Sequence, residues 1–570
     1  MVRALLSYRP VRVQSPPAVT AAGPAPVAPT AASQRRLDWF EIGVLAVFGA
    51  LSMWVVALDV WHAAADGLVW TGTDGYYIVD QMQYLSWIQS AAHHGLISNL
   101  FVLRSTPSDY FQPAILISGA ITALGVVSWL SLLLWKPVAV VGLFLATRAV
   151  ANRSFGVRIE RRAALILGLL FGSFTVIYGA LGILGDMMPT WLSWGYPFGL
   201  MAVALVLFAL VRYDRSRGAG RPDWIPGLLG AVASTLHPWQ GETLILLVLG
   251  AELVRWRDLL LWWRTEQWRR LALPVLTLVL TALPLVYYLL LGHLDVSWKL
   301  ARVASKHAFP FTAILIGAAP LAIPALLGYR GRSATFLELL LRLWAPVAVV
   351  IYVLSATGLS ATPLHAFDGI TIPLAMLAVK GVTRSRLASV PRGRLVAAAV
   401  IALGVVPANA YALVTAHNFV DPAGGNANFI THDELGALKY LAKDPDSGGV
   451  LTQFYLGEAV PGRTGRRTFV GDCLWSEPNC MPRALGADAL FEGQDSKAAA
   501  RTFVRQSGAR FLLASCSSQD VGLKRTLGSL IVSTRRFGCA TVYELDAPTS
   551  ATGPLAELPG NAAVRAPRRQ

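Results

Sequence analysis

Repeated apolar runs of roughly 18 to 22 residues dominate this sequence and limit what the chain can fold into. As a helix, a run of this length spans the hydrocarbon core of a bilayer. The chain has 570 residues, of which 54% are hydrophobic and only 14% are charged. The sequence therefore predicts an α-helical polytopic membrane protein.

The basic residues set the expected orientation of the spans. Arginine-rich loops alternate with loops that are less basic, and basic loops stay on the cytoplasmic side. This predicts about eleven spans in a cell membrane, with a cytoplasmic N-terminus and an extracytoplasmic C-terminus. These loops also account for the net charge of +16, so nucleic acid is not an expected partner. The expected spans are residues 39–61, 128–150, 163–183, 192–212, 224–237, 241–257, 271–291, 311–329, 340–357, 369–382 and 395–415.

Composition divides the chain into four parts. The N-terminal stretch is rich in Pro, Ala and Arg and lacks the apolar core of a signal peptide. The expected parts are a disordered cytoplasmic tail (1–36), a transmembrane domain (37–417) with a large first outer loop (62–127), an extracytoplasmic α/β domain (418–545) and a second disordered tail (546–570). Within the α/β domain we expect helices near 432–443, 496–507 and 521–531, and strands near 449–454, 467–471, 509–515 and 540–545.

All four cysteines follow the last expected span, in the part that is expected to be exported. An even number of cysteines there favours disulfides, because exported domains fold in an oxidising compartment. We favour the pairs Cys473–Cys480 and Cys516–Cys539, although four cysteines allow three pairings. Four unpaired thiols are the alternative.

The stretch "VDQMQYLSWIQSAAHHGLISN" (79–99) is polar and aromatic, and it follows the first apolar run. As a helix it places Tyr84 and Leu85 on one side and Gln83 on another, and Gly95 is its expected stop. This predicts an interfacial helix on the outer surface. Asp80 stands at its head, where it is either a functional carboxylate or a simple helix cap.

These features resemble the GT-C superfamily of membrane glycosyltransferases, which includes protein O-mannosyltransferases and the aminoarabinose transferases of lipid A. The resemblance rests on Asp80 and Tyr84 in "DQMQY", on Gly95, and on the Pro-containing helix and basic-ended span of residues 111–156. It is specific for about the first 150 residues and only architectural beyond them. The family usually has an acidic pair in this loop. Here Asp80 is followed by a glutamine, and Asp74 is the nearest other acid.

The resemblance implies an inverting transferase that takes a sugar from a polyprenyl-phosphate donor on the outer face of the membrane. The acceptor would be a glycan, a lipid or a protein of the envelope. Such a reaction needs a base for the acceptor hydroxyl, and Asp80 suits this role, with Asp74 as the other candidate. It also needs cations for the departing phosphate, which we expect from Arg104, Lys299, Arg302, Lys306 and His307.

Polar residues interrupt an apolar stretch at "STLHPWQGET" (234–243). Polar, non-helical backbone near membrane depth is tolerated where it lines a wet cavity. We therefore expect His237, Trp239 and Gln240 to contact the sugar or phosphate. The alternative is a hairpin tip that is merely polar.

Further ionisable residues stand at the same expected side of the membrane. Asp186, His365 and Asp368 end other spans, and together with Asp80 they could hold a divalent cation, but no cofactor is predicted. The loop 293–311 is basic although it is expected outside. It would grip the donor phosphate or, alternatively, contact anionic membrane lipids.

Two other functions compete with the transferase. The first is a transporter or flippase for lipid-linked sugars, although the sequence shows no internal repeat. The second is a non-catalytic scaffold for envelope assembly. A nucleotide-sugar donor is disfavoured because the sequence has no G-x-x-x-x-G-K-[ST] motif.

Overall fold

The computed structural model describes residues 36–173, 185–305, 311–330, 333–357, 362–385, 393–423, 425–446, 448–519 and 521–546. The two expected tails fall almost entirely outside these residues, as do Lys306 and His307. The side chain of Asp186 is also outside the description.

Eight helices of the described part are long and apolar enough to cross a membrane, and each coincides with one expected span. They are α1 (Trp39–Ala65), α4 with α5 (Ser128–Leu133 and Trp135–Ser154), α9 (Pro197–Ala219), α13 (Trp268–Leu294), α15 (Phe311–Gly328), α16 (Phe336–Ala356), η3 with α17 (Pro363–Phe367 and Thr371–Arg384) and α18 (Gly393–Phe419). The other three expected spans correspond to shorter helices: α6 (Arg158–Leu170), α10 (Ile225–Leu236) and α11 (Pro238–Val254).

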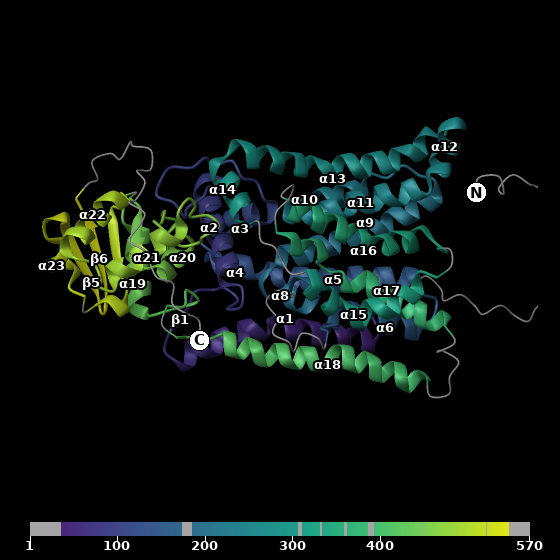
Figure 1. The fold of residues 1–570 in the computed structure, drawn as a ribbon, viewed down its shortest axis with the longest axis horizontal. Coiled ribbons are helices and arrows are strands. Elements are labelled where there is room, and N and C mark those ends of the chain that lie inside the picture. Colours follow the sequence, from purple (N-terminus) through teal and green to yellow (C-terminus); the bar gives the residue numbers. More distant parts are fainter. Residues whose placement is uncertain are drawn as a thin grey trace, which may run out of the picture. The chain divides into compact units, whose positions relative to one another are not determined.

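The spans differ in how much of their surface is enclosed by protein. The apolar window of α9 is 78% buried, whereas that of α13 is only 22% buried. Figure 1 shows α9, α11, α13 and α16 running side by side. Large apolar side chains such as Leu283 and Ile323 remain exposed on the outer helices. This distribution is expected where lipid replaces water as the solvent, because an apolar side chain facing lipid costs nothing there.

At the arginine-rich ends of the spans, buried carboxylates form ion pairs with basic residues. Glu338 is only 3% exposed and pairs with Arg342, Lys380 and Arg384 at 2.7, 2.7 and 3.2 Å. Arg217 pairs with Glu252 at 2.8 Å. The arginines of this end thus form structural ion pairs in addition to any effect on orientation.

The stretch that follows the first span folds into helix α2 (Ile78–His94). Gly95 ends it as expected, with φ of 75° and its N–H donating to the carbonyl of Ala91. The helix is not at the surface, however, because α3 (Pro113–Ala123) and α20 (Phe454–Thr464) both contact it. A Cβ on Gly462 of α20 would lie 2.8 Å from that of Leu85, so only glycine permits this approach. Gln83, expected to face away from the apolar side, is buried.

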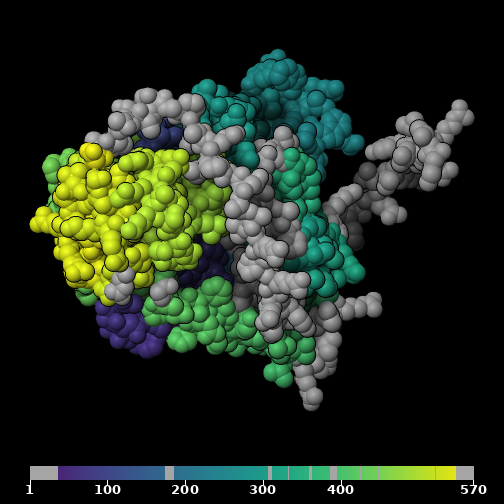
Figure 2. Space-filling model, turned by 60° about the vertical axis from the view of Figure 1, so that its left-hand side comes forward, coloured from purple at the N-terminus to yellow at the C-terminus, as the bar shows by residue number. Residues whose placement is uncertain are grey.

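The C-terminal region, residues 429–545, contains a four-stranded sheet with the order β3-β4-β6-β5. The strands are β3 (Val450–Thr452), β4 (Phe511–Ala514), β5 (Ile531–Phe537) and β6 (Ala540–Leu545). Strands β3 and β4 are parallel, and the other neighbours are antiparallel. The helices are α19 (His432–Lys443), α20, α21 (Cys480–Phe491), α22 (Lys497–Ser507) and α23 (Leu523–Leu527). Figure 2 shows this region gathered in one lobe.

In the C-terminal region one expected strand is wrong and one strand was missed. The helix expected near 521–531 is present as α23 and the 3-10 helix Gly528–Leu530, but strand β5 follows it from Ile531. Ile531, Val532 and Thr534 are β-branched, which favours extended backbone, and Ile531 and Thr534 pair with the neighbouring strand. The expected strand at 467–471 makes only an isolated bridge between Thr468 and Val450.

The C-terminal region carries two disulfides, and they are the favoured pairs. Cys473 bonds Cys480, with the Cα atoms 5.2 Å apart, and Cys516 bonds Cys539, with the Cα atoms 4.7 Å apart. A small antiparallel pair also joins this region to the first loop, where β1 (Val69–Trp70) runs beside β2 (Phe429–Ile430).

Candidate functional site

Asp80 lies in the first turn of α2, at the helix end that faces the start of α9. The N-cap position of α2 is Tyr77, so Asp80 does not serve as the cap. The hydroxyl of Tyr196 donates a hydrogen bond to the Asp80 carboxylate at 2.8 Å. Tyr196 itself ends α8 (Pro189–Gly195) and begins α9, and its ring lies 4.8 Å from that of Tyr77. The carboxylate is half-buried and held in a defined position.

His365 lies beside Tyr196, and His237 and Asp368 lie beside His365. The ring of His365 lies 5.7 Å from that of Tyr196, and the ring of His237 lies 4.8 Å from that of His365. The carboxylate of Asp368 lies 3.6 Å from Nδ1 of His237 and 3.7 Å from Nδ1 of His365. Trp239 covers both imidazoles, with ring centroids at 4.8 and 4.6 Å. We call these six residues, Asp80, Tyr196, His237, Trp239, His365 and Asp368, the acid–imidazole cluster.

Interrupted helices place the imidazoles of the cluster. His237 has extended backbone between α10 and α11, and Pro238 starts the second helix. His365 lies in the short helix η3, which begins at Pro363. Because a Cβ on Gly199 would lie 3.5 Å from the His237 ring, α9 approaches this imidazole closely. His237 and Gln240 are buried here, and the expectation that residues 234–243 line a wet cavity stays a prediction.

Gln240 directly follows Trp239 in the sequence, and Tyr84 follows Asp80 by four residues. Their side chains differ in burial and in hydrogen bonding. Gln240 is fully buried, and its amide nitrogen and oxygen find no hydrogen-bond partner within the described residues. Buried amides are usually bonded, so these atoms are available to a bound ligand or water. Tyr84 is half-buried and packs its ring against Trp87 and Phe198.

The cluster also offers ligands for a metal ion. One atom each of His237, His365 and Asp368 lies within 4.8 Å of the others. Two imidazoles and one carboxylate form a donor set that suits zinc and other divalent transition metals. A second group, around Asp433, contains Cys516 and Cys539, whose sulfurs are already bonded to each other.

Asp74, the second expected catalytic acid, has a different environment. It is 4% exposed and forms an ion pair with Lys136 at 2.5 Å. Gln81 accepts a hydrogen bond from the Asp74 backbone and donates to its carboxylate. A small cavity borders Asp74 and Lys136. A single lysine within an apolar run is a sequence signal for a buried, partnered charge, but the sequence does not indicate which acid is the partner.

The expected phosphate-binding cations lie on separate segments and differ in exposure. Arg104 and Lys299 are exposed, and Arg302 is half-buried on α14 (Val296–Ala304). The residue after α14 approaches the loop of His365, because the Thr362 N–H donates to the carbonyl of Ser305 at 3.3 Å. The basic helix α14 is therefore connected to the cluster, whereas the structure does not bring Arg104 into it by any hydrogen bond or ion pair of the described residues.

Two acids of the C-terminal region, Asp472 and Glu458, have raised pKa values. Burial, together with the negative charge of Asp80, raises the pKa of Asp472 to about 7. Burial and then the charge of Asp472 raise the pKa of Glu458, on α20, well above its ordinary range. Neither residue was predicted, because they lie some distance along the sequence from the first loop and carry no motif.

The raised pKa of Asp472 predicts a loss of stability as pH rises. Below the ordinary aspartate pKa of 3.8 both the folded and the unfolded chain are protonated here. Between pH 3.8 and about 7 the unfolded chain loses this proton while the folded chain keeps it. Unfolding is thereby favoured by about 4 kcal/mol at the upper end of this window.

Asp472→Asn removes this titration and keeps the oxygen that accepts from the Leu474 N–H. We expect this variant to be more stable than the unchanged protein at pH 8, with little difference at pH 4, in thermal unfolding of purified protein. Glu492→Gln, which removes an exposed acid of the same region, is the control and should change neither value. Equal effects of the two substitutions at pH 8 would contradict the assignment.

Comparisons with known proteins identify structural likenesses only. No family model matches the sequence, and no curated protein matches it. The oligosaccharyltransferase of Archaeoglobus fulgidus in its apo form is 13% identical, with a TM-score of 0.49 over 87% of this chain and 73% of that chain. ArnT from Cupriavidus metallidurans bound to undecaprenyl phosphate is 15% identical, with a TM-score of 0.48 over 88% of this chain and 98% of that chain. Both are GT-C glycosyltransferases, the superfamily that the sequence resembles. At these values the likeness concerns the path of the chain alone.

Proposed function

We propose that this protein is an integral membrane glycosyltransferase that moves a sugar from a polyprenyl-phosphate donor to an acceptor of the cell envelope. The observation that supports it most is the acid–imidazole cluster, in which Tyr196 bonds Asp80 of α2 and packs beside His365, which in turn packs beside His237. A half-buried carboxylate held by a neutral tyrosine hydroxyl is suited to take a proton from a bound hydroxyl group.

In the proposed reaction, Asp80 accepts the proton of an acceptor hydroxyl as its oxygen attacks the anomeric carbon. The bond from this carbon to the phosphate oxygen breaks, and polyprenyl phosphate leaves with the electron pair. Attack from the face opposite the phosphate inverts the configuration. Tyr196 orients Asp80 by its hydrogen bond, and Arg302 and Lys299 of α14 neutralise the leaving phosphate.

A divalent cation fits the same site. His237, His365 and Asp368 would hold it, and a bound cation would supply positive charge beside the phosphate. Trp239 offers an aromatic face to the sugar ring, and the amide of Gln240 offers both a donor and an acceptor to sugar hydroxyls.

A flippase for lipid-linked sugars is the second candidate, because of the buried charges near Asp74. The Asp74–Lys136 pair lies at the start of a span, and Asp59 lies fully buried within α1, where Asn428 donates to it at 2.6 Å. Ionisable groups within spans are frequent in transporters. In the structure Asp74 pairs with Lys136, and Asp59 accepts from the Gly75 N–H and the Asn428 amide, which supports a structural role.

Proteoliposomes distinguish the two candidates. The purified protein would be reconstituted with radiolabelled polyprenyl-phosphate monosaccharides and supplied with envelope glycans extracted from cells. Transfer predicts label in the glycan together with an equal amount of released polyprenyl phosphate. Movement of the intact donor between leaflets, with no label in the glycan, would instead establish the flippase.

A further inference from the structure

A short amphipathic helix, α12 (Trp256–Arg264), connects two of the expected spans at their arginine-rich ends. Only Arg255 separates it from α11, and residues 265–267 separate it from α13. Figure 1 shows α12 at one end of α13. Its nine residues form a helix only about 14 Å long. A helix joined this closely to the ends of two spans stays near the membrane surface.

One side of α12 is attached to the rest of the protein. Trp262 is buried, and the guanidinium groups of Arg217 and Arg270 lie 4.9 and 5.7 Å from the centre of its ring. Asp258, one turn earlier on the same side of the helix, pairs with Arg217 at 3.0 Å. These contacts fix which side of α12 faces the protein and which side faces away from it.

The other side of α12 is apolar and exposed. Trp256, Leu260 and Trp263 share this side by their helical spacing, and they are 51, 42 and 59% exposed. The ring of Trp268, the first residue of α13, lies 4.3 Å from that of Trp263 and is also exposed. One to two turns further along α13, Val275 is exposed as well. Exposed apolar side chains thus continue from α12 onto a span whose surface is expected to face lipid.

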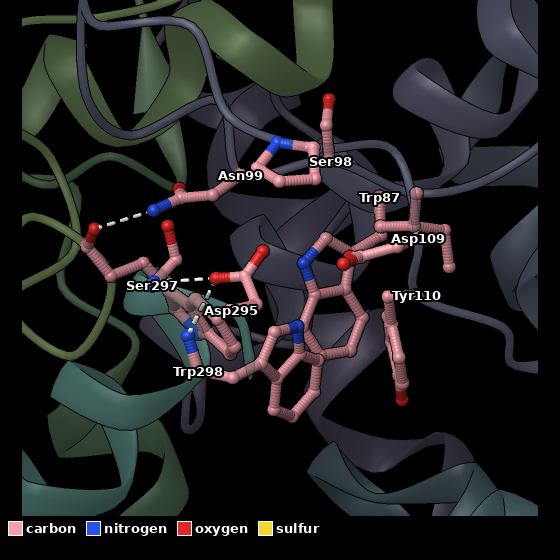
Figure 3. Close-up of a pocket in the computed structure, with 11 residues that line it drawn as sticks. Trp87, Ser98, Asn99, Asp109, Tyr110, Asp295, Ser297 and Trp298 are labelled. Atoms are coloured by element: carbon pink, nitrogen blue, oxygen red, sulfur yellow. Dashed lines mark hydrogen bonds between the residues drawn. The ribbon is translucent and has the colours of Figure 1, made fainter. Parts of the chain in front are cut away.

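The tryptophans beside α2 and α14 have a different environment. Trp298 and Trp87 are nearly parallel at 6.2 Å, and the ring of Tyr110 lies 4.4 Å from that of Trp298 (Figure 3). Trp87 and Tyr110 are buried. The apolar surface of these rings is therefore covered by the protein itself, whereas that of Trp256 and Trp263 is left to the surroundings.

Basic residues accompany the apolar side of α12. Residues 255–270 contain five arginines and two acids, and one of the acids, Asp258, pairs with Arg217. The five arginines are exposed, and within the described ranges none of them forms an ion pair with a carboxylate. They are Arg255, Arg257, Arg264, Arg269 and Arg270. Exposed indoles beside uncompensated guanidinium groups are typical of a helix in the headgroup region of an anionic membrane.

We propose that α12 lies in the headgroup region at the arginine-rich ends of the spans and binds anionic phospholipids there. Trp256, Leu260 and Trp263 insert below the lipid phosphates. Arg257 and Arg264, two turns apart on one flank of this side, bind the phosphates through their guanidinium groups. A soluble protein is a poorer fit, because to cover this side it would have to enter the lipid around α13. The inference does not depend on the proposed transferase function.

The depth of α12 is measured on the full-length protein in nanodiscs of phosphatidylglycerol and phosphatidylcholine. All four cysteines are in disulfides, so Leu260→Cys supplies the only free thiol for a nitroxide label. We expect this label about 5 to 10 Å below the phosphates, accessible to oxygen and shielded from a water-soluble nickel complex. Lys439→Cys, at an exposed position of α19, is the control and should be open to the nickel complex. Equal access at the two positions would mean that α12 faces water and is open to a soluble partner, which would overturn the proposal.

The lipid preference is measured by native mass spectrometry of the protein with equal amounts of the same two lipids. We expect phosphatidylglycerol to be enriched. Each arginine near an anionic surface contributes about a fivefold preference, so Arg257→Gln combined with Arg264→Gln should lower the enrichment about tenfold or more. Arg505→Gln combined with Arg525→Gln removes two exposed arginines of the C-terminal region and is the charge-matched control. Equal binding of the two lipids, or equal effects of the two double variants, would overturn the proposal.

Discussion

Replacing Asp80 with asparagine is expected to lower sugar transfer about 100-fold or more, because the variant lacks a base for the acceptor hydroxyl. Asparagine has the same shape, and its side-chain oxygen can still accept from Tyr196 at the observed 2.8 Å. Folding and donor binding should therefore survive. The measurement is the initial rate of transfer from a polyprenyl-phosphate sugar in proteoliposomes, with thermal unfolding recorded on the same samples.

Three further substitutions serve as comparisons for Asp80→Asn. Tyr196→Phe removes only the hydrogen bond that orients the carboxylate and should cause a smaller loss than Asp80→Asn. Asp66→Asn removes an exposed acid of the same loop and should change nothing. Near-normal transfer by Asp80→Asn, together with loss of transfer in Asp74→Asn at normal stability, would move the base to Asp74.

The second large effect is expected at the buried ion pair of Lys136 and Asp74, whose side chains are 5% and 4% exposed. Lys136→Met leaves a buried carboxylate without its cation. Removing one partner of such a pair typically lowers the free energy of unfolding by about 3 to 5 kcal/mol. We expect a loss of this size in thermal or denaturant unfolding of the protein in detergent.

A double variant distinguishes the effect of the uncompensated Asp74 charge from the effect of lost packing by the Lys136 side chain. Adding Asp74→Asn to Lys136→Met removes the uncompensated charge and should recover much of the lost stability. Lys439→Met, at an exposed lysine of α19, is the control and should have almost no effect. If Lys136→Met were no more damaging than this control, the pair would not be a structural element of the fold.

Local patterns in the sequence were sufficient for much of the fold. The length of the apolar runs located all eight long spans, and Gly95 marked the end of α2, because these features depend on residues close in the chain. The favoured cysteine pairs are those of the structure. Strand β5 was missed because a short run of β-branched residues next to helix-like sequence does not show its pairing partner.

The candidate site was predictable only as a list of residues. The sequence singled out Asp80, His237, Trp239, His365 and Asp368. The structure packs the last four together and links Asp80 to them through Tyr196. The sequence did not indicate Tyr196, whose hydroxyl donates to Asp80, or Asp472, whose pKa is raised partly by the charge of Asp80. Lys136 and Asp74 are 62 residues apart, and no local rule specifies such a partner. Contacts of this kind depend on how the helices pack.

A structure of the protein bound to a non-hydrolysable phosphonate analogue of a polyprenyl-phosphate sugar would show where the donor reacts. We expect the anomeric carbon beside Asp80 and the acid–imidazole cluster, with the phosphonate toward α14. An analogue bound instead in the cavity beside Asp74 and Lys136, with its anomeric carbon away from Asp80, would rule out Asp80 as the base.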